Sequence, residues 1–204
     1  KAGEGSKFTD KQYSEAGATI VHSPQEVYKA DIILKIEPPT LDEIELFKPG
    51  QTLISALQLG HLDQEYIHAL LRKKVTALAY EFIEDKVGGM PIIRAMSEIA
   101  GSTVILIAAE YLSTANKGKG VILGGITGVP PTKVVIVGAG TVAEYAARAA
   151  LSLGAEIQVF DNQIYKLRRI KHTLGHQFYT STIDTVTLSE SLKKADVVIG
   201  ALRA

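Results

Sequence analysis

The segment "VVIVGAGTVAEYAARAALSLGAEIQVFD", residues 134–161, constrains the fold of this chain more than any other. Its first four residues are apolar and β-branched, which is typical of a strand buried on both faces. Gly138, Gly140 and Ala143 then form the pattern G-x-G-x-x-A. The first glycine of such a pattern permits a tight turn, and the second lets the backbone approach a pyrophosphate. The third small residue lets the following helix pack on the sheet.

The residues after the glycines continue the same pattern. Alanines recur at helical spacing from Ala143 to Ala150, so the predicted helix can lie close to the strands. A second strand is predicted over residues 156–160, and Asp161 ends it about 20 residues after the glycines. That carboxylate can accept hydrogen bonds from ribose hydroxyls and would repel a 2′-phosphate. The segment therefore predicts a dinucleotide site that favours NAD over NADP; the alternative is a βαβ unit whose glycines only form a turn.

Composition excludes several classes of function. The 204 residues are 46% hydrophobic, with 22 basic and 22 acidic side chains, which is ordinary for a globular protein. Zero net charge gives no support for binding to nucleic acid or an anionic membrane. Without cysteine there can be no disulfide, cysteine-bound zinc or thiol nucleophile, which fits a cytoplasmic protein.

Two further features bear on metals and membranes. The acidic pair Glu84 and Asp85 is followed by Lys86 without convergent ligands, so we expect no metal site. The longest apolar stretch, residues 99–112, contains Ser102 and Glu110 and is predicted to be too short to cross a bilayer.

Strand and helix patterns alternate along the first 90 residues. The predicted elements are helices over 9–16, 23–29, 41–47 and 63–74, and strands over 19–21, 31–36, 52–56 and 75–79. Alternation with short connections predicts a parallel sheet covered by helices. One long helix is predicted over 91–115. It is followed by the glycine-rich run 117–131, which suits turns and a domain junction.

These patterns predict an α/β protein of two doubly wound domains joined by the long helix. Residues 1–91 would form a partial substrate-side domain, and residues 92–204 a Rossmann NAD-binding domain. Because the chain opens at Lys1 without Met and stops soon after a strand-like run at 196–201, we expect further segments before and after it.

Motifs along almost the whole chain resemble the alanine dehydrogenase and pyridine nucleotide transhydrogenase α-subunit family. They include "GEGSKFTDKQYSEAGA", "ADIILKIEPP", "MPIIRAMSEIAG", "VILGGITGVPPTKVVIVGAG" and "ADVVIGA", in that order. The resemblance is closer to alanine dehydrogenase. It implies NAD as cofactor and hydride transfer between NAD(H) and a small amino acid or 2-oxo acid. It also implies a small-molecule substrate and a homo-oligomer.

The resemblance assigns cofactor-binding roles where residues match. Ser97 matches the serine of M-S-E-x-A-G that contacts the cofactor near its phosphates, although a helix serine can instead bond its own backbone. Asp161 matches the ribose-binding acid, and Leu202 matches a small apolar position beside the cofactor. The predicted cofactor-binding residues are Ser97, Gly138, Ala139, Gly140, Thr141, Val142, Asp161, Asn162, Lys166, Ala201 and Leu202.

The catalytic positions depart from the family pattern. Alanine dehydrogenases use a Lys in L-K-V-K-E-P to bind the substrate carboxylate, and "LKIEPP" places Glu37 there. Their catalytic His falls on Gln58 in "SALQLG", and a glutamine cannot titrate. The transhydrogenase relatives also lack that Lys and that His. Lys35 and His61 are candidates to take over these roles; alternatively, Lys35 pairs with Glu37 and His61 is a surface histidine.

Three functions therefore remain open at this stage. The first is an NAD-dependent dehydrogenase resembling alanine dehydrogenase, with Glu37, Gln58, Lys35 and His61 as candidate catalytic residues. The second is a transhydrogenase-like subunit that passes hydride between nucleotides and works with a membrane partner. The third is a dinucleotide-binding protein without catalysis, which acts as a sensor or an interaction module.

Overall fold

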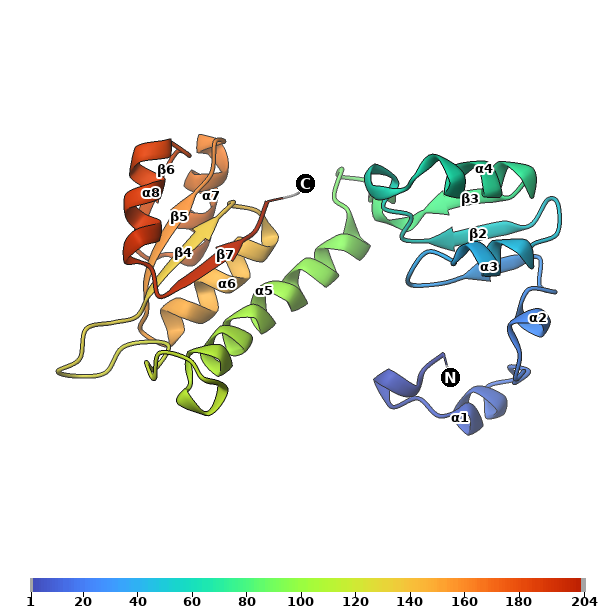
Figure 1. Ribbon diagram of the computed structural model, residues 1–204, viewed down its shortest axis with the longest axis horizontal. Helices are drawn as coiled ribbons and strands as arrows, with labels where there is room; N and C mark the ends of the chain where they lie inside the picture. The colour runs from blue at the N-terminus through green and yellow to red at the C-terminus, as the bar shows by residue number, and fades with distance from the viewer. Residues whose placement is uncertain (1, 203–204) are drawn as a thin grey trace. The chain divides into compact units, whose positions relative to one another are not determined.

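The computed structural model describes residues 2–202, without the side chain of His61. The chain divides into two compact units, Lys1–Ile92 and Ile93–Ala204 (Figure 1). Each unit contains one parallel β-sheet with helices packed against it. The predicted α/β class with two domains is therefore confirmed.

The N-terminal unit is built on a three-stranded sheet of order β1-β2-β3. Its elements are η1 (Glu4–Ser6), α1 (Asp10–Glu15), α2 (Pro24–Val27), β1 (Ile32–Leu34), α3 (Leu41–Glu45), β2 (Thr52–Ser55), η2 (Leu59–His61), α4 (Gln64–Arg72), β3 (Thr76–Ala79) and η3 (Tyr80–Phe82). The strand predicted over 19–21 is wrong. Residues 18–22 have no regular secondary structure, because no described strand pairs with them.

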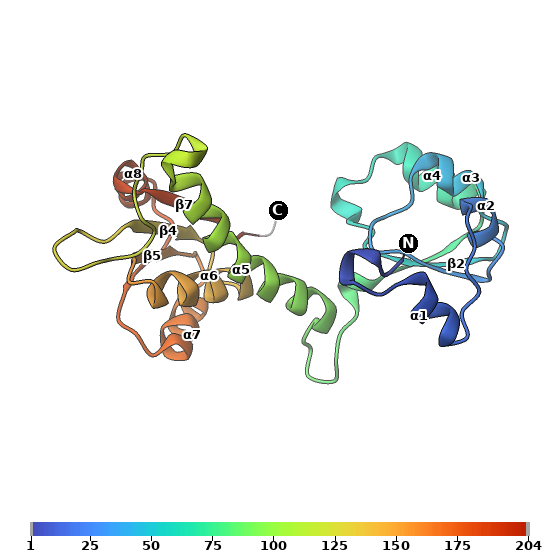
Figure 2. The same ribbon diagram turned by 90° about the horizontal axis from the view of Figure 1, so that it is seen from below.

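Only one face of this sheet is well covered by the described residues. Helices α3 and α4 lie together over it (Figure 2), and Ile33 and Leu53 are buried beneath them with Tyr28 and Phe47. The alternate side chains point the other way, so Ile32 and Leu34 are 60% and 74% exposed. A parallel sheet usually has both faces covered, so this uncovered face is unusual.

The C-terminal unit has a four-stranded sheet of order β6-β5-β4-β7. Its elements are α5 (Pro91–Leu112, which begins in the N-terminal unit), η4 (Thr114–Asn116), β4 (Lys133–Val137), α6 (Thr141–Ser152), β5 (Glu156–Phe160), α7 (Ile164–Leu174), β6 (Tyr179–Ser181), α8 (Thr185–Lys194) and β7 (Val197–Gly200). Helices α6 and α7 lie on one face of the sheet and α8 on the other (Figure 2). The winding reverses between β5 and β7, on either side of β4, which is where doubly wound folds bind ligands.

The glycine-rich run 117–131 lies inside the C-terminal unit, so its prediction as a domain junction is wrong. The N–H of Gly125 donates to the carbonyl of Leu153, and the N–H of Thr132 donates to the carbonyl of Gly124. The first bond holds the loop against the end of α6, and the second closes the loop on itself just before β4. The division between the units falls at the start of α5, between Ile92 and Ile93, which is one residue from the boundary predicted between residues 91 and 92.

Helix α5 is longer than the apolar stretch suggested. It begins at Pro91 and runs for 22 residues, and an 18-residue window within it has a mean hydropathy of 1.6, so by length and composition alone the helix could cross a bilayer. The stretch 99–112 considered in the sequence is only the C-terminal part of this helix, so the length criterion is met by Pro91–Leu112 and not by that stretch alone. One such helix is weak evidence for a membrane protein, and Ile105 and Leu112 pack in the core of the C-terminal unit.

Gly101 brings α5 into close contact with α6. A Cβ atom at this position would lie 2.5 Å from the carbonyl oxygen of Val142 and 2.7 Å from the Cβ of Tyr145. Neither atom can move without shifting α6, whose first turn leads into the glycine loop. The contact therefore requires a residue without a side chain.

Gly101→Ala should destabilise the C-terminal unit by about 1–3 kcal/mol, the usual cost of overpacking a tight contact. The higher helix propensity of alanine offsets only about 1 kcal/mol. Urea denaturation followed by circular dichroism measures the change. Thr103→Ala, at an exposed position of the same helix, is the control. Equal stability of the two variants would contradict the close contact.

Candidate functional site

A cavity of about 380 Å³ lies at the carboxyl ends of β4, β5 and β7. Most of the predicted cofactor-binding residues line it, together with two residues that the sequence did not single out. The lining consists of Ser97, Gly140, Thr141, Val142, Asp161, Lys166, Arg169, Gly200, Ala201 and Leu202. The structure therefore brings a serine of α5 together with the glycine loop, the acid after β5 and the end of β7.

The two glycines of the loop have different roles. Gly138 has φ +115°, and a Cβ there would lie 2.6 Å from the carbonyl carbon of Ala201. Only glycine fits this crowded, left-handed position. Gly140 lines the cavity, and a Cβ there would meet no heavy atom within 4 Å. The absence of a side chain at Gly140 therefore keeps space open for a ligand, whereas at Gly138 it allows the chain to fold.

Helix α6 points its N-terminus at this cavity. Gly140 is the N-cap residue, and no side chain caps the first turn. The free N–H groups of that turn carry a partial positive charge, which suits a phosphate. Four alanines of the helix are buried against the sheet, as the sequence predicts: Ala143, Ala146, Ala147 and Ala150.

Asp161 both lines the cavity and holds the glycine loop. The residue is only 5% exposed. Its Oδ2 accepts a hydrogen bond from the N–H of Ala139 at 2.8 Å, and its Oδ1 accepts one from the N–H of Gln163 at 2.7 Å. An ionised carboxylate has about four acceptor positions, so two remain for ribose hydroxyls.

Arg169 is the main lining residue that the sequence reading missed. Its Nη2 donates to the carbonyl of Ala139 at 3.0 Å. Ala139 is also the loop residue whose N–H donates to Asp161, so both charged side chains bind the same residue. The sequence did contain a signal that could have identified Arg169: this residue follows the predicted cofactor residue Lys166 by about one turn of α7, so both side chains lie on the same face of the helix. Lys166, Arg169 and Asp161 give the lining a net charge of +1.

Three predicted cofactor residues lie outside the lining. Gly138 and Ala139 lie beneath it, since Gly138 packs on Ala201 and Ala139 is fully buried. Asn162 faces the neighbouring loop, where its Oδ1 accepts a hydrogen bond from the N–H of Ile183 at 3.3 Å. Their contribution here is to the shape of the loops around the cavity.

Glu81 and Tyr80 connect the ends of the three strands in the N-terminal unit. The Glu81 carboxylate accepts hydrogen bonds from the N–H groups of Leu57 and Gln58, at 3.2 and 2.7 Å. The Tyr80 hydroxyl donates to the carbonyl of Ile36 at 2.6 Å. Gln58 adopts a left-handed backbone conformation with φ +49°, which this anchoring maintains.

Lys35 does not pair with Glu37, so that expectation is wrong. Its Nζ lies 2.6 Å from Oε2 of Glu43 in α3. Glu43 is fixed there by a reciprocal cap with Thr40 at the start of α3, whereas Glu37 is exposed. Burial alone would raise the pKa of Glu43, but its hydrogen bonds with Lys35 and Thr40 lower it. The fourth candidate, His61, has its side chain outside the described residues.

The carboxyl edge of this sheet is acidic. Glu37 and Glu81 both lie at it, and Lys35 is held by Glu43. Burial raises the pKa of Tyr80, and the charges of Glu81 and Glu37 add to this effect, so the phenol stays neutral at pH 7. This edge offers hydrogen bonds and negative charge.

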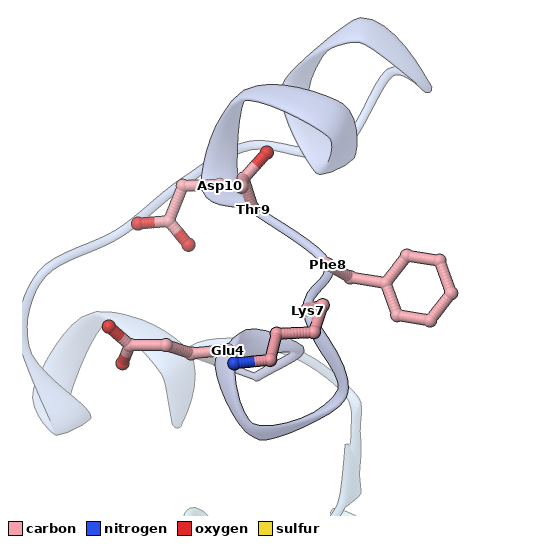
Figure 3. Close-up of a pocket in the computed structure, with 5 residues that line it drawn as sticks. All are labelled: Glu4, Lys7, Phe8, Thr9 and Asp10. Carbon is pink, nitrogen blue, oxygen red and sulfur yellow. The ribbon is translucent and has the colours of Figure 1, made fainter.

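Another cavity, of about 420 Å³, lies near the start of the chain. Glu4, Lys7, Phe8, Thr9 and Asp10 line it, and the Phe8 ring points away from the other labelled side chains (Figure 3). None of these residues was a predicted site residue. Their arrangement indicates no particular chemistry.

Two family models cover nearly the whole chain. Residues 1–100 match the model "Alanine dehydrogenase/PNT, N-terminal domain", and residues 104–204 match "Alanine dehydrogenase/PNT, C-terminal domain". The chain belongs to this family. The resemblance predicted from the sequence is therefore confirmed.

Individual relatives agree with the family models. Alanine dehydrogenase of Mycolicibacterium smegmatis is 39% identical over 202 residues, which is 98% of this chain and 54% of that protein. A solved L-alanine dehydrogenase matches with a TM-score of 0.84 and 33% identity, over 96% of this chain and 54% of that one. The transhydrogenase from Sinorhizobium meliloti matches with a TM-score of 0.77 and 26% identity, over 98% and 58%. The chain thus spans about half the length of these relatives.

Gly138→Ala should destabilise the C-terminal unit by about 1–3 kcal/mol, because it combines an unfavourable φ with a clash against Ala201. Thermal unfolding followed by near-ultraviolet circular dichroism measures this. Gly140→Ala is the matched control, since its side chain would enter open space. If both variants unfold at the same temperature, the distinct roles of the two glycines are contradicted.

Proposed function

We propose that this protein is part of an NAD(H)-dependent oxidoreductase that passes hydride between the nicotinamide and a small amino acid or 2-oxo acid. Family membership supports the reaction class. The observation that carries the cofactor assignment is the cavity above an open Gly140, at the N-terminus of α6 and beside a buried acid. These are the features that a dinucleotide requires of a Rossmann domain.

The residues present fit an NAD molecule. Backbone N–H groups of the loop from Gly138 to Thr141 would hold the pyrophosphate. Asp161 would accept hydrogen bonds from the adenosine ribose, and Ser97 would contact the phosphates from α5. Lys166 adds a cation, and Ala201 and Leu202 offer an apolar surface. When bound, the cofactor supplies the hydride chemistry, and the protein supplies orientation and electrostatics.

The candidate catalytic edge fits an unmodified alanine dehydrogenase poorly. An ammonium and a carboxylate about 4 Å apart attract by roughly 4 kcal/mol at an effective dielectric constant of 20. Glu37 turns this attraction into a repulsion of similar size when it is ionised. Lys35 cannot compensate while Glu43 holds it at 2.6 Å. The acidic edge therefore favours a substrate that presents a cationic or uncharged group to Glu37.

One specific observation favours a second function. With Glu37 and Gln58 at the catalytic positions, no described side chain there matches the expected cation and proton carrier. A protein that passes hydride between nucleotides needs neither group, and the transhydrogenase similarity supports this alternative. A catalytically inactive NAD-binding protein is the third reading. NADH-dependent reduction of a second nucleotide by the full-length protein would distinguish the transhydrogenase-like function from the dehydrogenase and from the inactive NAD-binding protein.

Several broader properties also belong to this proposal. We expect a small-molecule substrate, a cytoplasmic location and a homo-oligomer. The exposed apolar side chains of α5 support the last expectation, because Ile99 and Leu106 are each 68% exposed one heptad apart. No nucleic-acid partner is expected, since the net charge is zero.

Gly140→Val should abolish saturable NADH binding while leaving the fold intact, because its side chain would fill the open space that the pyrophosphate needs. NADH fluorescence titration measures binding, and circular dichroism verifies folding. Gly5→Val, at another open glycine in the N-terminal unit, is the control and should bind normally. Unchanged NADH binding by Gly140→Val would show that the cofactor lies elsewhere.

The unmodified full-length protein should be a poor alanine dehydrogenase, and the double variant Glu37→Lys, Gln58→His should be faster. Loss of a positioned acid-base group alone costs roughly 10²-fold or more in rate. Steady-state NADH production from L-alanine measures both proteins. The screen also includes a cationic substrate and one without a carboxylate. Efficient turnover of L-alanine by the unmodified protein would contradict the assignment of Glu37 and Gln58.

A further inference from the structure

Asp161 and Arg169 bind opposite ends of one residue in the glycine loop. The carboxylate accepts the N–H of Ala139, and the guanidinium donates to its carbonyl. The two charged groups therefore lie on either side of Ala139, and both line the cofactor cavity. Lys166, one helical turn before Arg169, lines the same cavity. The acid that should set nucleotide choice is thus accompanied by two cations.

Both cations share the cavity lining with Asp161, and Arg169 binds the same loop residue as Asp161 does. They come from α7, which follows Asp161 in the chain, whereas the N–H groups of α6 serve the pyrophosphate. Arg169 uses one N–H for Ala139, and its guanidinium has further donors for a ligand.

A phosphate monoester at the ribose 2′ position carries a charge of about −1.5 to −2 at pH 7. Asp161 repels this charge, and Lys166 and Arg169 attract it. Arginine is well suited to such a group, because its planar donors match phosphate oxygens. The net electrostatic effect on a 2′-phosphate is therefore less repulsive than in a site that contains the acid without these cations.

We propose that Arg169 is a specificity-determining residue that lets this site accept NADPH as well as NADH, with only a modest preference for NADH. This inference rests on the proposed cofactor function. It adds a ligand class, the 2′-phosphorylated dinucleotide, to the one that Asp161 alone would select. Arg169 also positions the glycine loop, so loss of its charge and loss of its tether must be separated experimentally.

The experiment compares NADH and NADPH affinities of the full-length protein by fluorescence titration at low ionic strength, where charge effects are least screened. Arg169→Gln should weaken NADPH binding about ten-fold relative to NADH, the size of one hydrogen bond to a charged group. Arg168→Gln removes the same charge from the same helix outside the cavity lining, and it should leave the ratio unchanged. Asp161→Ser should shift the ratio in the opposite direction, towards NADPH.

Each remaining outcome has a definite meaning. Arg169→Lys keeps the charge, so it should retain NADPH binding even where Arg169→Gln folds poorly. Equal weakening of both nucleotides by Arg169→Gln would show a purely structural tether and overturn the inference. Unchanged affinity for both nucleotides in Arg169→Gln would overturn it as well. The unmodified protein could bind NADPH while Arg169→Lys and Arg169→Gln show the same ratio of NADPH to NADH affinity. In that case the charge at Arg169 does not determine nucleotide specificity, and the inference is overturned. Failure of the unmodified protein to bind NADH at all would instead overturn the proposed function.

Discussion

Close packing of α6 against the sheet is the constraint on which the candidate site depends. Four alanines bring this helix onto β4 and β5, and Gly101 lets α5 approach it from another side. With larger residues at these positions the helix would move outward, and its N-terminus would no longer face the cavity. The partial positive charge, the open Gly140 and the place of Ser97 in the same cavity lining all depend on how these two helices pack.

The C-terminal unit was largely predictable from sequence, because its local signals agree with one another. Buried β-branched strands, glycines at fixed spacing and an alanine-rich helix all specify one βαβ unit. Eight of the eleven predicted cofactor residues line one cavity. Arg169 was missed because a basic side chain on an amphipathic helix is ordinary in sequence. Only its hydrogen bond to Ala139, 30 residues earlier, distinguishes it.

The N-terminal unit was predicted less well, and for a physical reason. Its strands have only three or four residues, so a short irregular segment such as 19–21 cannot be distinguished in sequence from a true strand. Ion pairing depends on side-chain direction and burial rather than on sequence distance. Lys35 therefore binds Glu43, eight residues away, instead of the nearer Glu37. The left-handed Gln58 likewise depends on Glu81, which lies on a different strand end.

Asp161 links the choice of cofactor to the rigidity of the loop that receives it. Because the same carboxylate fastens Ala139 and Gln163, the loop has its receptive shape before any nucleotide arrives, and little ordering entropy is lost on binding. Exchanging this acid for a neutral residue would free two backbone donors at once. A lineage that changed nucleotide by altering the acid would first need another anchor for these amides. Change through α7 leaves both amide bonds to Asp161 in place and loses at most the single bond from Arg169 to Ala139, so it is the easier route for evolution.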